Sequence, residues 1–231
     1  MKTIGLLGGI TCESSLVYYK LINEMTREKL GGHHAAKSVM ISVDFAEVQP
    51  LTEAGDWDGV LAILLKAARD IERGGADLLL LCANTAHKLA DEIGREIGIP
   101  IVHIVDATAR EITKSGFNKV GLLGTRFTME HDFYKGRLVE KHGLKVVIPD
   151  EADREIVHRV IYGELCLGVI KPESRRAFAK IIEKLAAAGA QGVILGCTEI
   201  ENLVRQEDSA VPVFPTTRIH AEAAVEWALN K

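Results

Sequence analysis

The sequence predicts an α/β protein made of two similar halves, each built around a parallel sheet. Short apolar runs alternate with longer amphipathic segments along the chain, which is typical of βαβ units. Segments of the first half also recur in the second, so the same unit is expected twice. With 231 residues, of which 47 % are hydrophobic and 26 % charged, the composition is that of a globular protein able to bury a core.

The short apolar runs predict the strands, and the segments between them predict helices. Apolar residues in those segments recur at helical spacing, which favours helices with one face on a core. Examples are Leu61, Leu64, Leu65, Ala68 and Ile71, and later Phe178, Ile181, Ile182 and Leu185. Strands are predicted at Thr3–Leu7, Val39–Val43, Leu78–Cys82, Ile101–Ile104, Val120–Leu123, Lys145–Ile148, Val193–Leu195 and Val211–Phe214.

Two pairs of similar segments define the repeat. KTIGLLGGITCES resembles NKVGLLGTRFTME, with Gly5 matching Gly121, and GGADLLLLCANTAHKL resembles AAGAQGVILGCTEIENL, with Gly75 matching Gly189. The prediction is two pseudo-symmetric α/β domains, residues 1–100 with 214–231, which include a closing C-terminal helix, and residues 101–213. Because open parallel sheets bind ligands beyond the carboxyl ends of their strands, we expect the active site in the cleft between the domains.

Composition and motifs exclude several classes of function. Lys and Arg number 28 against 32 Asp and Glu, so no electrostatic feature predicts a nucleic-acid or anionic-membrane partner. The apolar run Leu78 to Ala83 is far shorter than the ~20 residues that span a bilayer. The N-terminal segment predicts a strand and turn instead of a secretory signal, so a cytoplasmic protein is expected.

The cysteine pattern predicts free thiols. Cys12, Cys82, Cys166 and Cys197 are widely spaced and form no CxxC motif. The sequence contains no HExxH or GxSxG motif and no paired Cys/His ligand set, so neither a metal site nor serine chemistry is expected.

Cys197 is the first candidate catalytic residue. Thr198 and Glu201 have the spacing of a capping box, which predicts that Thr198 caps a helix beginning at Glu199. A thiol at a helix N-terminus has a pKa below the usual ~8.5, so a thiolate would be available near neutral pH. The alternative is that Cys197 is simply a small buried residue.

The segment after the run Leu78–Cys82 offers a carboxylate site. Asn84 or Thr85 can cap the next helix, and the exposed amides beyond it would suit a carboxylate. The alternative is that both residues are ordinary caps. His87 has no partner visible in the sequence, and we expect it to be solvated.

The glycine-rich segment GLLGGIT lacks the spacing of either common phosphate loop. Gly8 and Gly9 are predicted to let the backbone approach a small ligand, with Thr11 as a hydroxyl donor. The echo GLLGT puts Thr125 in the equivalent place. Arg126 follows it and could pair with a carboxylate bidentately, although an exposed arginine is the more common outcome.

Taken together, LLLLCANTAHKL, GVILGCTEIENL, GLLGGITCES and GLLGTRFTME resemble the aspartate/glutamate/hydantoin racemase superfamily, in its branch of amino-acid racemases. The resemblance runs to the closing VPVFPTTRIHAEAAV. It implies two flavodoxin-like domains and a racemase that needs no cofactor, neither pyridoxal phosphate nor metal. It also implies an amino-acid substrate, with aspartate or glutamate expected, and a homodimer.

The resemblance further implies two thiols on opposite sides of the substrate α-carbon, one removing the α-proton while the other returns one. Cys197 and Cys82 are the candidates for these roles. Substrate-binding groups expected at the strand ends are Gly9, Thr11, Asn84, Thr85, Thr125, Arg126 and Thr198.

The sequence departs from the two-thiol pattern at Ala83. Members with two thiols commonly have Cys-Asn-Thr, whereas here Ala83 separates Cys82 from Asn84, and the internal repeat matches Ala83 to Cys197. Because successive side chains of a strand point to opposite faces, this shift predicts that Cys82 faces away from the substrate.

Several alternatives follow. A β-bulge could aim Cys82 back into the cleft. The second proton could instead come from Thr85, Cys12 or a held water. Cys197 alone could serve a related decarboxylation or cis–trans isomerisation, and a noncatalytic binding protein would also fit two facing α/β halves.

Overall fold

The computed structural model describes residues 1–230 and divides into two compact units. Unit 1 comprises residues 1–103 and the chain from His220 onward, and unit 2 comprises residues 104–219. The second division falls later than the predicted one at 213/214. The reason is that helix α11 (Thr216–Leu229) starts in unit 2, where the Thr216 hydroxyl donates a hydrogen bond to the Leu195 carbonyl at 2.8 Å.

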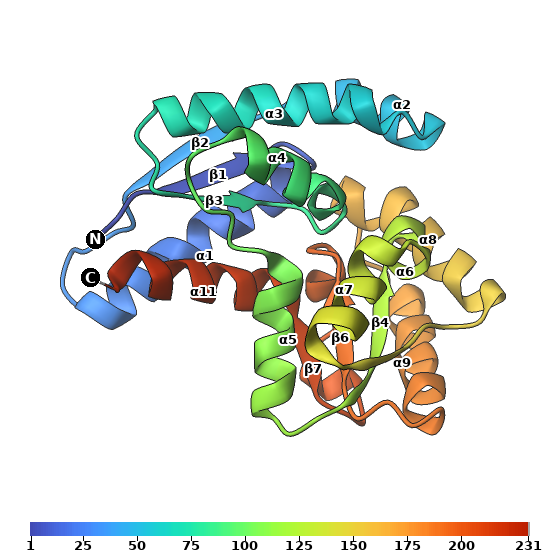
Figure 1. Ribbon diagram of the computed structural model, residues 1–231. Coiled ribbons are helices and arrows are strands. Elements are labelled where there is room, and N and C mark those ends of the chain that lie inside the picture. The colour runs from blue at the N-terminus through green and yellow to red at the C-terminus, as the bar shows by residue number, and fades with distance from the viewer. Residues whose placement is uncertain (231) are drawn as a thin grey trace. The chain divides into compact units, whose positions relative to one another are not determined.

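Unit 1 contains a three-stranded parallel sheet in the order β2-β1-β3 (Figure 1). Most of α11 completes this unit. Its other elements are, in chain order, β1 (Ile4–Gly8), α1 (Cys12–Leu30), β2 (Ser38–Ser42), α2 (Phe45–Ala54), α3 (Trp57–Arg73), β3 (Leu78–Leu81), the 3₁₀ helix η1 (Thr85–Leu89) and α4 (Ala90–Glu96).

Unit 2 contains a four-stranded parallel sheet in the order β5-β4-β6-β7. The order of its first three strands repeats that of unit 1, which confirms the predicted pair of pseudo-symmetric parallel sheets. Its elements are α5 (Ile104–Lys114), β4 (Lys119–Gly124), α6 (Arg126–Glu130), α7 (Asp132–His142), β5 (Lys145–Val147), α8 (Glu151–Gly163), η2 (Leu165–Leu167), α9 (Pro172–Ala187), β6 (Val193–Gly196), α10 (Ile200–Leu203), η3 (Gln206–Asp208) and β7 (Val213–Pro215).

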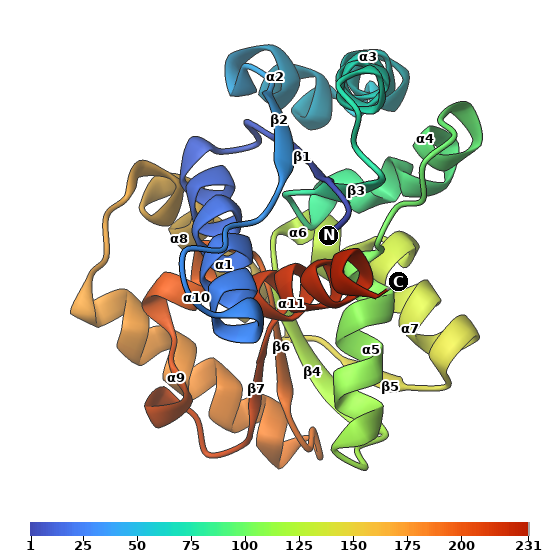
Figure 2. The same cartoon turned by 90° about the vertical axis from the view of Figure 1, so that its left-hand side faces the viewer.

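Helices cover both faces of the unit 1 sheet, and strand alternation decides which side chain meets which helix. Leu79 and Leu81 pack with α3, whereas Leu78 and Leu80 pack with α1 and α11. Figures 1 and 2 both show α3 on one side of this sheet and α1 and α11 on the other. Burial on both faces explains why β3 is an uninterrupted apolar run.

The same division holds in unit 2. Leu195 packs with α8 and α9 on one face of the sheet, and Ile194 packs with α5 and α7 on the other. Within residues 1–230, no helix combines the length and the apolar character needed to cross a bilayer.

The predicted strand Ile101–Ile104 is wrong. Ile101 forms only a single bridge with Leu79, through hydrogen bonds from Leu79 to the Pro100 carbonyl and from Val102 to the Leu79 carbonyl. Pro100 has no N–H to extend the ladder on one side, and α5 already begins at Ile104 on the other.

Candidate functional site

Cys197 lies directly beyond the carboxyl end of β6. The ladder between β4 and β6 ends at the pair Gly124–Gly196, and Cys197 is the next residue. Its side chain packs on the same core as Leu195, and only 8 % of the residue is exposed. The local fold therefore presents a nearly buried thiol where a parallel sheet commonly binds its ligand.

Glu199 is the immediate partner of this thiol. The Cys197 S–H donates to the Glu199 carboxylate, with Sγ and Oε2 2.9 Å apart, and Glu199 is also buried. Burial, and then the Glu199 charge, raise the pKa of the Cys197 thiol well above its usual value. The expected lowering of this pKa is therefore wrong, and the thiol is protonated at neutral pH. Glu199 is not among the site residues predicted from the sequence, although its position two residues after Cys197 is a usable signal.

The predicted capping box is also wrong. Helix α10 begins at Ile200 and has only four residues, and the turn before it uses the Thr198 carbonyl, which accepts from the Glu201 amide at 3.2 Å. The Glu201 carboxylate instead accepts from the Thr217 amide at 2.7 Å. Burial raises the pKa of Glu201 to about 8, against the lowering effect of that amide. Thr198 remains buried beside Cys197 in the chain.

Ala83 occupies in unit 1 the position that Cys197 occupies in unit 2. Strand β1 pairs with β3 in the same register as β4 pairs with β6 when Gly5 is matched to Gly121. Counting along the two ladders then matches Ala83 to Cys197. Ala83 also belongs to the same core as Leu81, as Cys197 belongs to that of Leu195.

Cys82 faces the opposite core. Its amide donates to the Leu7 carbonyl at 2.9 Å, which continues the ladder regularly, and its side chain packs with Tyr18 and the alanines of α11. Its S–H donates a long hydrogen bond to the Leu80 carbonyl, with Sγ and the oxygen 4.0 Å apart. Burial raises the pKa of this thiol far above its usual value. The geometry thus favours a structural cysteine over a re-aimed acid–base group.

The segment after β3 is buried, contrary to the expectation for His87. Asn84 is buried and precedes η1, which starts at Thr85, and the Asn84 side chain forms no cap. His87 is only 3 % exposed, and its Nδ1–H donates to the Ala83 carbonyl at 3.0 Å. The predicted capping role of Asn84 is therefore wrong.

Three buried histidines, His87, His103 and His220, lie close together in unit 1. The ring of His87 lies 4.8 Å from that of His103 and 5.3 Å from that of His220. His220 Nε2–H donates to the Val102 carbonyl at 2.6 Å, so its Nδ1 accepts from the Tyr18 hydroxyl at 2.7 Å. Burial, and then nearby His87, lower the pKa of His220, which is neutral. Spacing along the chain gave no signal for this cluster.

The backbone conformation at position 9 itself requires glycine, and the predicted approach of a ligand to Gly9 stays a prediction. Its φ is +94°, and a Cβ at this position would lie 2.0 Å from the Val43 carbonyl oxygen. Thr11 is the N-cap of α1 and accepts from the Ser14 amide at 3.3 Å. At Gly8, an added Cβ would meet Ser15.

Thr125 and Arg126 both have partners within unit 2. Thr125 is the N-cap of α6 and accepts from the Thr128 amide at 3.3 Å. The Arg126 guanidinium pairs with the exposed Glu155 carboxylate at 2.5 Å. Arg126 is thus an exposed arginine in an ion pair, the alternative recognised from the sequence.

All four cysteines are free, as predicted. Within the described residues, no group of three or more His, Cys, Asp or Glu side chains is arranged to hold a metal ion. The predicted ligand cleft between the two units stays a prediction.

Comparisons with known proteins agree on one family. The profile of the family described as Asp/Glu/Hydantoin racemase matches residues 7–224. The crystal structure of a candidate Asp/Glu racemase from Yersinia pestis shares 51 % identity, with 100 % of both chains covered and a TM-score of 0.93. An aspartate racemase homologue from Pyrococcus horikoshii shares 40 % identity over 100 % of both chains, with a TM-score of 0.87. The broad specificity amino-acid racemase RacX of Bacillus subtilis is 23 % identical over 177 residues, 75 % of this chain and 74 % of RacX.

Proposed function

Because the chain belongs to the Asp/Glu/hydantoin racemase family, we propose that it is a cofactor-independent amino-acid racemase, acting on aspartate or glutamate, with Cys197 as an acid–base group. The observation that carries this proposal is the Cys197 thiol, buried at the end of β6 and hydrogen-bonded to Glu199. A pure binding protein has no need of such a pair. The likeness to an aspartate racemase homologue supports the substrate class.

The Cys197–Glu199 pair can hold and move one proton. In one direction the thiol donates its proton to the planar, enolate-like α-carbon of the substrate. In the other, the Glu199 carboxylate takes up the thiol proton, and the thiolate removes the α-proton while the carbon electron pair delocalises into the substrate carboxylate. Two negative charges side by side in a buried site are costly, so the free pair holds one proton between its two groups, and after each transfer to or from the α-carbon it regains that state by exchanging one proton with water or with the second acid–base group.

Ala83 makes the proposed enzyme asymmetric. A methyl group cannot exchange a proton, and Cys82 packs into the core, so the second face of the α-carbon needs a group other than a thiol on β3. Cys12, one of the groups predicted from the sequence for this second role, is exposed, and its S–H donates to the Glu13 carboxylate at 3.1 Å. The Thr85 hydroxyl or a held water is the better proposal, because Thr85 follows Ala83 closely at the start of η1.

The test is proton NMR of single amino acids in deuterium oxide with the purified, pyridoxal-free protein, combined with chiral analysis. Loss of the α-proton signal of aspartate or glutamate with inversion supports the proposal, provided that Cys197→Ser abolishes it. Serine keeps the hydrogen bond to Glu199, but its hydroxyl is a far weaker acid, so the variant is a matched control. Exchange that persists in Cys197→Ser would refute the role of this thiol.

The single thiol also favours a second candidate function, decarboxylation of a substituted malonate. That reaction needs one acid to protonate an enolate after carbon dioxide leaves, and Cys197 is protonated in the free protein. Release of carbon dioxide from an aryl-substituted malonate, without α-proton exchange of any amino acid, would select this function over racemisation.

A further inference from the structure

A basic hollow lies on the surface of unit 2, outside the site around Cys197. It encloses about 490 Å³ and is lined by Arg110, Thr113, Lys114, Lys141 and His142. A volume of ~300–1,000 Å³ is typical of a small-molecule site. Every charged side chain that lines it is basic, although the whole chain has a net charge of −4.

Two helices, α5 and α7, supply the residues that line this hollow. Asp106, Arg110 and Lys114 follow one another at four-residue intervals along α5 and so share one face of that helix. Helix α7 supplies Lys141 and His142 from its last turn. Basic residues near a helix C-terminus also complement the helix dipole, but that role does not require them to converge on one hollow.

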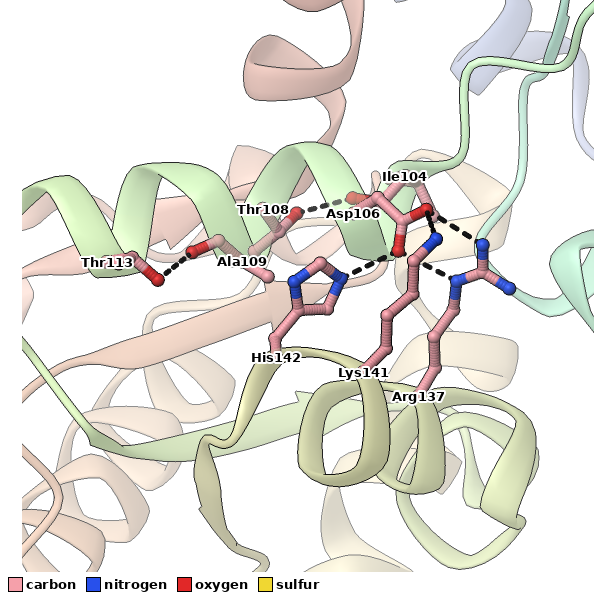
Figure 3. A network of polar contacts seen from close by, with 8 residues as sticks. All are labelled: Ile104, Asp106, Thr108, Ala109, Thr113, Arg137, Lys141 and His142. Atoms are coloured by element: carbon pink, nitrogen blue, oxygen red, sulfur yellow. Dashed lines mark hydrogen bonds and ion pairs between the residues drawn. The ribbon is translucent and has the colours of Figure 1, made fainter.

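Asp106 organises the cations from α7 (Figure 3). The Arg137 guanidinium donates two hydrogen bonds to its carboxylate, both at 2.8 Å, Lys141 donates one at 2.7 Å, and His142 Nε2–H donates one at 2.8 Å. Partial burial alone would raise the pKa of Asp106, yet these hydrogen bonds hold it well below its usual value. One carboxylate thus faces two permanent cations and a histidine, so positive charge remains in excess.

Arg110 carries an uncompensated charge. The residue is exposed, and its guanidinium makes no hydrogen bond or ion pair within residues 1–230. Lys141 uses one of its three N–H donors on Asp106 and keeps two for another acceptor. Lys114, by contrast, pairs with Glu111 at 2.7 Å.

We propose that this hollow binds the phosphate group of a small molecule. A phosphate dianion matches the excess of positive charge, and its oxygens suit a guanidinium fork and an ammonium group together. The Thr113 hydroxyl, which donates to the Ala109 carbonyl at 2.8 Å, would join them by turning its proton toward the phosphate. The hollow lies on α5 and α7, which pack on the face of the unit 2 sheet opposite to the core that holds Cys197. The ligand is therefore distinct from the substrate of the proposed reaction, and its binding is independent of the proposed function.

The proposal is tested by titrating the whole protein with pyrophosphate at physiological salt. Calorimetry measures the binding, and backbone amide NMR locates it. We expect saturable binding in the millimolar range or tighter, with shifted amides at Arg110, Thr113 and Lys141. Arg110→Gln should weaken binding about tenfold, the effect of losing one charge-assisted contact at a partly exposed site. Because Arg110 has no partner in the described chain, this variant should melt like the wild type.

Arg176→Gln is the matched control, since Arg176 lies on α9 of the same unit and is 69 % exposed in a pair with Glu173. Its binding should equal that of the wild type. The proposal is overturned if pyrophosphate does not saturate, if Arg110→Gln binds as well as Arg176→Gln, or if citrate binds as tightly as pyrophosphate.

Discussion

Two serine substitutions separate the chemical cysteine from the structural one. Cys82 and Cys197 both follow the third strand of their sheet, and both are buried. Cys197→Ser keeps a hydroxyl beside Glu199, whereas Cys82→Ser puts a hydroxyl into a core of aliphatic side chains and Tyr18. We expect Cys197→Ser to lose activity and keep stability, and Cys82→Ser to lose stability and keep activity.

The size of the Cys82 effect follows from its surroundings. The Leu80 carbonyl accepts from the Cys82 thiol at 4.0 Å, a distance that suits sulfur but is too long for a hydroxyl, so a serine hydroxyl in the same place is buried without a partner. Such a group costs about 1–3 kcal/mol. For a protein of this size, that cost corresponds to a fall in thermal midpoint of about 2–12 °C. Cys82→Ala, which adds no polar group, should lower the thermal midpoint less than Cys82→Ser does.

Stability and activity are measured on the same samples, stability by thermal melts with circular dichroism and activity by α-proton exchange with NMR. General acid–base groups contribute about 10²–10⁴-fold in rate, so Cys197→Ser should lose at least two orders of magnitude. If Cys82→Ser melts like the wild type but loses exchange as completely as Cys197→Ser, the register argument fails and both thiols act on the substrate.

Four further outcomes are expected. Ala83→Cys, which puts a thiol at the position of unit 1 equivalent to that of Cys197 in unit 2, should raise the racemisation rate about tenfold or more, and an unchanged rate would show that this position does not reach the substrate. Because burial and the Glu199 charge raise the pKa of Cys197, the pair keeps its one proton well above pH 7, and the thiolate forms by transfer of that proton to Glu199; kcat/KM in the direction where Cys197 removes the α-proton should therefore stay level from pH 7 into the alkaline range, and a steady climb with pH would contradict the transfer. Asp106→Asn should destabilise the protein by about 1.5–3 kcal/mol at neutral pH. Since the folded pKa of Asp106 is lowered, the difference from wild type in urea unfolding should shrink as the pH falls below the unfolded value of ~3.9, and a constant difference would refute the linkage. Gly9→Ala should cost about 1–3 kcal/mol in the same assay, because its φ is +94° and a Cβ would meet the Val43 carbonyl; a neutral effect would mean that this loop shifts readily.

Alternation and spacing along the chain were enough to predict much of the fold. The apolar runs and the repeat predicted two parallel sheets, and matching Ala83 to Cys197 predicted that Cys82 faces away from the candidate site. These features depend on residues close in sequence, because side-chain direction alternates along a strand whatever packs against it. The strand predicted at Ile101–Ile104 failed where a proline and an early helix interrupted the ladder.

The electrostatics of the candidate site were decided only by the tertiary structure. A helix N-terminus would lower the pKa of Cys197, but burial and the Glu199 carboxylate raise it, since α10 is too short to oppose them. His87 is buried because His103 and His220, distant in sequence, close around it. The sequence by itself determined the two sheets and the directions of their strand-end side chains, which follow from local geometry. Charge state and burial depend on every neighbour in three dimensions, so only the folded chain set them.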